Sequence, residues 1–154
     1  IFIDLWNIGL LERFCELPLS IHTTDFIIGE LKTQGVKDAI AQLHQEGKIT
    51  IKTFKSNEYA EIISLQDKNL SFQDCTVLYY ALNGDYKLLT GDRNLRVIAE
   101  RHGLQVSGII YVMDELLYHD ILSKEEYITK LKALLESNHR LPTKEIMKRI
   151  ENYH

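Results

Sequence analysis

The chain has 154 residues, of which 45% are hydrophobic, and a formal net charge of −4. This length is sufficient for one hydrophobic core and too short to indicate two domains. The acidic balance argues against a protein that coats nucleic acid by charge alone, because such binding needs clustered lysine and arginine. A nuclease that engages a short stretch of nucleic acid, or that works through bound cations, remains compatible with it.

The chain carries no pattern of a secreted or membrane protein. Its apolar runs fall well short of the roughly 20 residues that span a bilayer, and no secretory signal opens it. Cys15 and Cys75 lie far apart in segments of apolar periodicity, and no Cys/His cluster has zinc-finger spacing. We expect two buried thiols in a reducing compartment, and hence a cytoplasmic protein that does not bind membranes.

The first third of the chain mixes helical and strand patterns. Residues 1–14 have apolar residues at helical spacing, although residues 1–3 could instead end a strand. Residues 20–23 form a candidate strand, and Thr24 can cap the helix that follows, whose end we place at Gly35. The next helix, from Val36, stops at Gly47, and residues 49–53 then alternate as a strand does.

The same alternation continues to residue 106. A helical segment around Tyr59 precedes a helix that begins at Ser71 and runs to Gly84. Residues 87–90 form a short buried strand, a Gly-Asp turn leads into a helix that ends at Gly103, and residues 104–106 form one more strand.

The last third is helical. Ser123 and Glu126 form a capping box, and Pro142 precedes a final helix. Strands that alternate with helices favour an α/β fold with a mostly parallel sheet between two helical layers. We therefore expect one domain over residues 1–154, in which residues 109–154 are a helical extension that covers the sheet or forms a docking surface.

Two aspartates occupy positions where α/β proteins place ligands, near the carboxyl ends of strands. Asp92 directly follows the strand at residues 87–90 and begins a helix, where an aspartate also simply suits the helix dipole. Asp74 lies three residues after Ser71 and can complete a capping box. That role is compatible with binding a metal ion.

Two further acidic residues are weaker candidates. Glu30 lies on the flank of a helix, where most glutamates are solvated, and the neighbouring Gly29 hints at a close approach. Asp4 follows Ile1-Phe2-Ile3, which resembles a strand that ends in an aspartate; the alternative places Asp4 on the first helix.

Two stretches and their spacing resemble the second half of a PIN domain: residues 70–74, Leu-Ser-Phe-Gln-Asp, and residues 88–96, Leu-Leu-Thr-Gly-Asp-Arg-Asn-Leu-Arg. Residues 107–142 further resemble a PIN-like subgroup described as predicted nucleic-acid-binding proteins. The resemblance covers essentially the whole chain. It implies a three-layer α/β/α sandwich with an acidic metal site, and many bacterial members are toxins of toxin–antitoxin pairs.

The resemblance assigns roles to individual residues. The family's helix glutamate matches Glu30, its mid-chain aspartate matches Asp74, and the aspartate after its fourth strand matches Asp92. Thr90 matches a threonine or serine that often precedes the last of these and would hydrogen-bond a carboxylate or water. The family's first aspartate has no match at Asp4, and the spacing implies that this residue and its strand lie upstream of residue 1.

These matches imply a metal-dependent endoribonuclease. Hydrolysis of a phosphodiester needs an activated water, a stabilised phosphorane charge and a neutralised leaving oxygen, and Mg²⁺ or Mn²⁺ held by carboxylates supplies all three. Asp74 and Asp92 would be metal ligands, and Glu30 a ligand or a base that orients water. Arg93, Arg96 and Lys87 lie near the expected site and would contact RNA phosphates, although all three also suit ordinary solvated surface.

The expected partners are RNA, a small protein antitoxin and a second copy of the chain. Two other functions compete with the toxin nuclease. The first is a catalytically silent PIN-like module that binds RNA or protein. The second is a nucleotide-binding doubly wound domain, for which neither a Gly-x-Gly-x-x-Gly turn nor a Walker loop is present.

Overall fold

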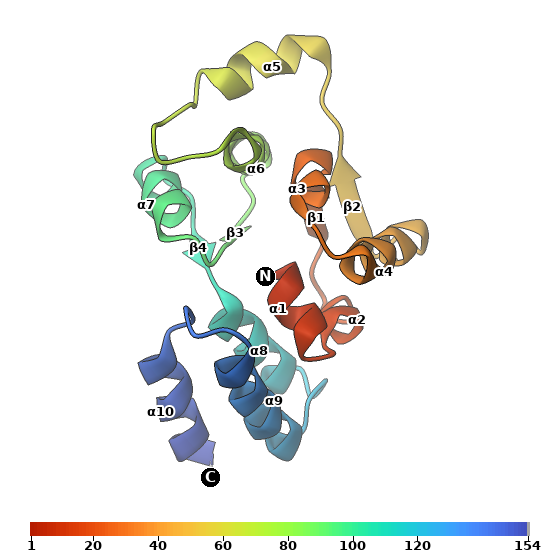
Figure 1. Cartoon of the computed structure of the whole chain (residues 1–154), viewed down its shortest axis with the longest axis vertical. Coiled ribbons are helices and arrows are strands. Elements are labelled where there is room, and N and C mark those ends of the chain that lie inside the picture. The colour runs from red at the N-terminus through yellow and green to blue at the C-terminus, as the bar shows by residue number, and fades with distance from the viewer. Residues whose placement is uncertain (154) are drawn as a thin grey trace. The chain divides into compact units, whose positions relative to one another are not determined.

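A computed structural model describes residues 1–153 and shows helices with short parallel strands (Figure 1). The chain divides into two compact units. We call Ser20–Ser107 the central unit, and Ile1–Leu19 with the chain from Gly108 onward the helical unit. The α/β class is confirmed, whereas the single domain over residues 1–154 stays a prediction.

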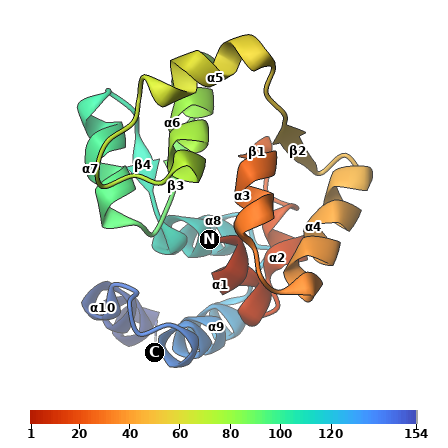
Figure 2. The same ribbon diagram turned by 45° about the horizontal axis from the view of Figure 1, so that its top comes forward.

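The central unit contains all of the strands among the described residues. Its elements in chain order are β1 (Ile21–Thr24), α3 (Asp25–Glu30), α4 (Gln34–Gln45), β2 (Ile49–Lys52), α5 (Ser56–Ile63), α6 (Phe72–Gly84), β3 (Leu88–Leu89), α7 (Arg93–Arg101) and β4 (Val106–Ser107). Figure 2 shows α5, in yellow, beside α6, and the two helices are in contact.

The strands form two parallel pairs. β1 pairs with β2, with Ile21 opposite Ile49, and β3 pairs with β4, with Leu88 opposite Val106. The single central sheet that the sequence led us to expect is therefore not seen among the described residues, whose strands make two separate two-stranded sheets. The physical reason is length, because β3 and β4 have only two residues each and form a ladder of two residue pairs.

One helix boundary was predicted wrongly. α3 ends at Glu30, because Leu31 turns to extended backbone (φ −67°, ψ 128°) and buries its side chain. Gly35, which we expected to end this helix, lies inside α4. The glycine stops further along are confirmed: Gly47 and Gly103 follow helices with φ of +78° and +86°, a backbone region that glycine adopts without strain.

A hydrophobic core stabilises the central unit. It joins α5, α6 and α7 to the short strand β3 through fully buried side chains, among them Ile62, Leu78, Leu88 and Ala99. Cys75 is fully buried in the same core. Cys15, by contrast, is only partly buried, so the expectation of two buried thiols holds for one of them.

The helical unit combines the two ends of the described chain. Its elements are α1 (Phe2–Asn7), α2 (Leu11–Phe14), α8 (Ile109–Tyr118), α9 (Lys124–Ser137) and α10 (Thr143–Tyr153). The opening residues are thus helical, and the alternative of a strand at residues 1–3 is wrong. The capping box at α9 is confirmed, since the Glu126 N–H donates to Ser123 Oγ at 3.1 Å. Within residues 1–153, no helix has both the length and the apolar character that crossing a membrane requires.

Candidate acidic site

Glu30 is positioned by the junction between β1 and α6. Thr24, the last residue of β1, caps α3 by accepting the Ile27 N–H at 3.2 Å. The same Thr24 hydroxyl lies 3.0 Å from the Thr76 hydroxyl on α6, and both threonines are fully buried. This buried contact holds the start of α3 against α6. Glu30 follows at the end of α3, one and a half turns further on, with its side chain exposed.

Asp74 lies in the first turn of α6 and belongs to a capping box, as the sequence predicted. The Ser71 N–H donates to Asp74 Oδ2 at 3.2 Å, and the Asp74 N–H donates to Ser71 Oγ at 3.0 Å. Partial burial raises the pKa of Glu30, and the nearby carboxylate of Asp74 raises it further. α3 and α6 are in contact, and the charge of Asp74 reaches Glu30, so we call these two residues the acidic pair.

Asp92 is the N-cap of α7. Its Oδ1 accepts the Asn94 N–H at 2.9 Å, which is the ordinary helix-start role of an aspartate. Thr90 stabilises this turn, because its hydroxyl, on a nearly buried side chain, accepts the Asp92 N–H at 3.1 Å. Thr90 is itself fixed to β4 through its N–H, which donates to the Ser107 carbonyl at 3.0 Å. Thr90 thus orients the backbone of Asp92 and not its carboxylate.

Carboxylate oxygens are the donors that Mg²⁺ and Mn²⁺ prefer, so the chemistry of these three residues fits a divalent cation. Glu30 and Asp74 lie on α3 and α6, two helices that are in contact. No group of three or more His, Cys, Asp or Glu side chains is arranged to hold a metal ion within residues 1–153. The roles of Glu30, Asp74 and Asp92 as metal ligands therefore all stay predictions.

Asp4 has a different environment. It lies on α1 in the helical unit, where its Oδ1 accepts the Asn138 Nδ2–H at 3.0 Å. This contact ties α1 to the residue that ends α9, which is a structural role. The interpretation of Asp4 as an aspartate at the end of a strand is wrong, because the residues around it are helical.

The other predicted residues are less constrained. Arg93 and Lys87 are exposed and Arg96 is partly buried, and their contact with RNA phosphates stays a prediction. The hint drawn from Gly29 is wrong, since a Cβ added there would meet nothing within 4 Å.

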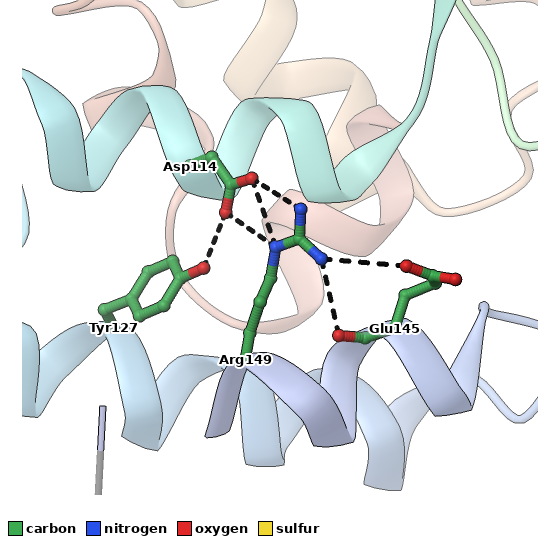
Figure 3. A network of polar contacts seen from close by, with 4 residues as sticks. All are labelled: Asp114, Tyr127, Glu145 and Arg149. Atoms are coloured by element: carbon green, nitrogen blue, oxygen red, sulfur yellow. Dashed lines mark hydrogen bonds and ion pairs between the residues drawn. The ribbon is translucent and has the colours of Figure 1, made fainter. Parts of the chain in front are cut away.

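Sequence reasoning missed a polar network in the helical unit (Figure 3). The buried Tyr127 hydroxyl donates to Asp114 Oδ1 at 2.6 Å, and Arg149 Nη2 donates to Asp114 Oδ2 at 2.9 Å. Burial and the Asp114 carboxylate raise the pKa of Tyr127, and the Asp114 hydrogen bond raises the pKa of Arg149. The network lines an open hollow of about 870 Å³ between α8, α9 and α10. The one sequence signal for this network is the four-residue spacing of Glu145 and Arg149 on α10, which predicts an ion pair between them.

Comparison with known families tests the resemblance that the sequence showed. A family model described as a PIN domain matches residues 1–154. The chain belongs to the PIN-domain family. No curated protein and no solved structure matches it. Membership in this nuclease-like family supports a general hydrolase role and the use of divalent metals, which PIN domains generally bind.

Proposed function

We propose that this PIN domain is a metal-dependent endoribonuclease that hydrolyses RNA phosphodiester bonds. The observation that carries the proposal is the acidic pair: Glu30 and Asp74 lie on two helices in contact, and the Asp74 carboxylate adds to the raised pKa of Glu30. Two carboxylates that repel each other are stabilised when a cation binds between them. Such a pair on a nuclease-like fold favours cation-dependent chemistry over a purely structural role.

Glu30, Asp74 and Asp92 would hold Mg²⁺ or Mn²⁺. A bound divalent cation would supply a nucleophilic water and neutralise charge on the phosphate and the leaving oxygen. The protein's own residues supply position: the contact between Thr24 and Thr76 fixes α3 against α6, and Thr90 fixes the turn at Asp92. Water oxygen forms the new bond to phosphorus, the bond to the leaving ribose oxygen breaks, and the water's proton passes to a base, for which Glu30 is the candidate.

Basic residues near Asp92 would bind the substrate. Arg93 and Arg96 lie in the first turn of α7, immediately after Asp92, and Lys87 precedes β3. Guanidinium and ammonium groups bind phosphate oxygens and set the register of the strand on the protein.

The test is cleavage of a short fluorescent single-stranded RNA by the full chain. We expect cleavage with Mg²⁺ or Mn²⁺, none with a chelator, and loss of cleavage in Asp92→Asn and Glu30→Gln. Glu136→Gln, an exposed glutamate on α9, is the matched control and should cleave normally. Cleavage that survives both chelation and Asp92→Asn would overturn the proposal. Binding of RNA without any cleavage would favour the silent binding module.

We further propose that the nuclease is the toxin of a type II toxin–antitoxin pair, that it forms a homodimer, and that its strands belong to a three-layer α/β/α arrangement. The support for all three is the PIN-like pattern of residues 70–74 and 88–96. Growth arrest on expression, relieved by co-expression of the product of the adjacent gene, would support the first of them. A monomeric mass by light scattering would contradict the dimer.

A further inference from the structure

Four aromatic side chains gather beside the acidic pair in the central unit. We call them the aromatic group: Phe26, Phe54, Tyr59 and Phe72. The Phe26 ring lies in the middle, with its centroid 5.1 Å from that of Phe72, 6.1 Å from that of Tyr59 and 6.2 Å from that of Phe54. Tyr59 stacks on Phe72 with an angle of 15° between the ring planes. The four rings come from α3, α5, α6 and the segment after β2, so the fold assembles them from distant parts of the sequence.

The aromatic group adjoins the acidic residues on two helices. Phe26 precedes Glu30 by four positions on α3, and side chains with this spacing lie on the same face of a helix. Phe72 is the first residue of α6, and Asp74 is the third. Because α3 and α6 are in contact, the rings and the carboxylates occupy neighbouring positions on the same pair of helices.

The aromatic group lies at the border between the core and solvent. Phe54 and Phe72 pack against the buried core of the central unit, but all four rings remain partly exposed. Phe26 belongs to α3, a helix whose described residues include none that is buried. Rings that gather at the surface and keep part of their area open beside polar groups offer aromatic area to a ligand.

A cation borders the rings. Lys52 Nζ lies 5.5 Å from the centroid of Phe54 and 3.5 Å from Glu58 Oε2, with about a third of its side chain exposed. Partly exposed rings with a lysine over one of them match the two parts of a nucleotide, because bases stack on aromatic faces and phosphates attract ammonium groups. An apolar protein segment would not need the lysine.

We propose that the aromatic group is a stacking platform for unpaired bases of the RNA whose backbone is cut at the acidic site, with Lys52 contacting a phosphate. The inference rests on the proposed function and adds to it a surface that would hold the bases of the substrate. A base paired in a duplex has both faces covered by its neighbours and cannot stack on the platform. Selection therefore depends on unpaired bases, without a need for a particular base sequence.

The experiment measures binding by fluorescence anisotropy of the full chain carrying Asp92→Asn, which prevents cleavage. Two labelled single strands of equal length are compared, one with bases and one abasic. Tyr59→Leu and Phe26→Leu should each weaken binding of the strand with bases by about 5- to 150-fold, the range expected for one lost stack, and leave the abasic strand unaffected. Lys52→Gln should weaken both strands alike. Tyr118→Leu, which replaces an 80% exposed tyrosine of the helical unit, is the matched control.

A second measurement does not depend on removing a ring. The chain has one tryptophan, so Tyr59→Trp in a Trp6→Phe background gives a single reporter in the platform. Its fluorescence should be quenched by the strand with bases and unchanged by the abasic strand. Equal quenching by both strands, or ring variants that bind both strands as the parent does, would overturn the inference. Cleavage without base-dependent binding would defeat the platform alone, whereas base-dependent binding without cleavage would defeat the nuclease proposal alone.

Discussion

The polar network of the helical unit and the acidic pair of the central unit place their carboxylates in opposite surroundings. In the helical unit, Asp114 is bonded by Arg149 and Tyr127, and Glu126 pairs with Arg13 at 2.6 Å. In the central unit, the charge that acts on the pKa of Glu30 is instead that of another carboxylate, Asp74. Among the described residues, no ion pair neutralises either member of this acidic pair.

This difference separates two uses of the same functional group. A carboxylate whose oxygens accept hydrogen bonds from fixed donors links elements of the fold and has little left to offer a ligand. Two carboxylates held together without a cation raise the free energy of the folded state and bind a cation to recover it. Substitution of a carboxylate of the first kind should lower stability, and substitution of one of the second kind should lower activity.

The largest expected effect is on catalysis. Glu30→Gln should lower the rate of metal-dependent RNA cleavage by about a hundredfold or more, because a neutral amide is a far poorer ligand and base. Arg149→Gln, which breaks the Asp114 network, should change that rate by less than about threefold while lowering the melting temperature. Single-turnover cleavage assays measure both rates. Equal loss of activity in Glu30→Gln and Arg149→Gln would contradict the distinction between the two kinds of carboxylate.

The next effect concerns the contact that places α3. Thr76→Val removes the hydroxyl that donates to the Gln73 carbonyl at 2.6 Å and contacts Thr24 at 3.0 Å. We expect a loss of about 1 to 2 kcal/mol in the free energy of unfolding, because the buried Thr24 hydroxyl loses a partner. Chemical denaturation measures this loss. Thr129→Val on α9, an exposed threonine, should change it by less than about 0.5 kcal/mol.

A smaller effect is expected in the helical unit. Tyr127→Phe keeps the buried ring and removes the hydroxyl that donates to Asp114, which retains Arg149 as a donor. The free energy of unfolding should fall by about 1 kcal/mol. RNA cleavage should be unchanged. Cleavage lost in step with stability would show that the network serves the reaction and not only the fold.

The smallest effect depends on pH. The pKa of Glu30 is raised in the folded chain, so its ionisation costs stability as the pH rises through that pKa. Without divalent cations, Glu30→Gln should therefore be slightly more stable than the parent at neutral pH, by less than about 1 kcal/mol because the group is exposed. The difference should vanish once the pH falls below the ordinary pKa of a glutamate, where Glu30 is protonated in both the folded and the unfolded chain. Thermal melts over that range that run parallel for the two proteins would contradict the acidic pair.

Local signals made much of the fold predictable. The helices that begin after Ser71 and Ser123 follow capping boxes, and those that stop before Gly47 and Gly103 are ended by glycines in left-handed backbone. These devices act within a few residues and can be read directly. The error at Gly35 arose because this glycine lies inside α4. α3 ends before it, at the extended backbone of Leu31.

Long-range features escaped sequence reasoning. The division of the strands into two pairs depends on which backbone groups meet across the fold, and hydrophobic periodicity does not encode it. The same holds for the contact between Thr24 and Thr76, 52 residues apart. The positions of Glu30, Asp74 and Asp92 came from the resemblance to a family, since the patterns around each suited ordinary surface or capping roles.

Divalent cation binding at the acidic pair tests the account most directly. Titration calorimetry of the full chain with Mn²⁺ should show binding that weakens at least about tenfold in both Glu30→Gln and Asp74→Asn. Glu145→Gln, in the helical unit, should bind as the parent does. Mn²⁺ binding that is absent from the parent, or equal in all four proteins, would contradict the claim that the pair of Glu30 and Asp74 holds a metal ion.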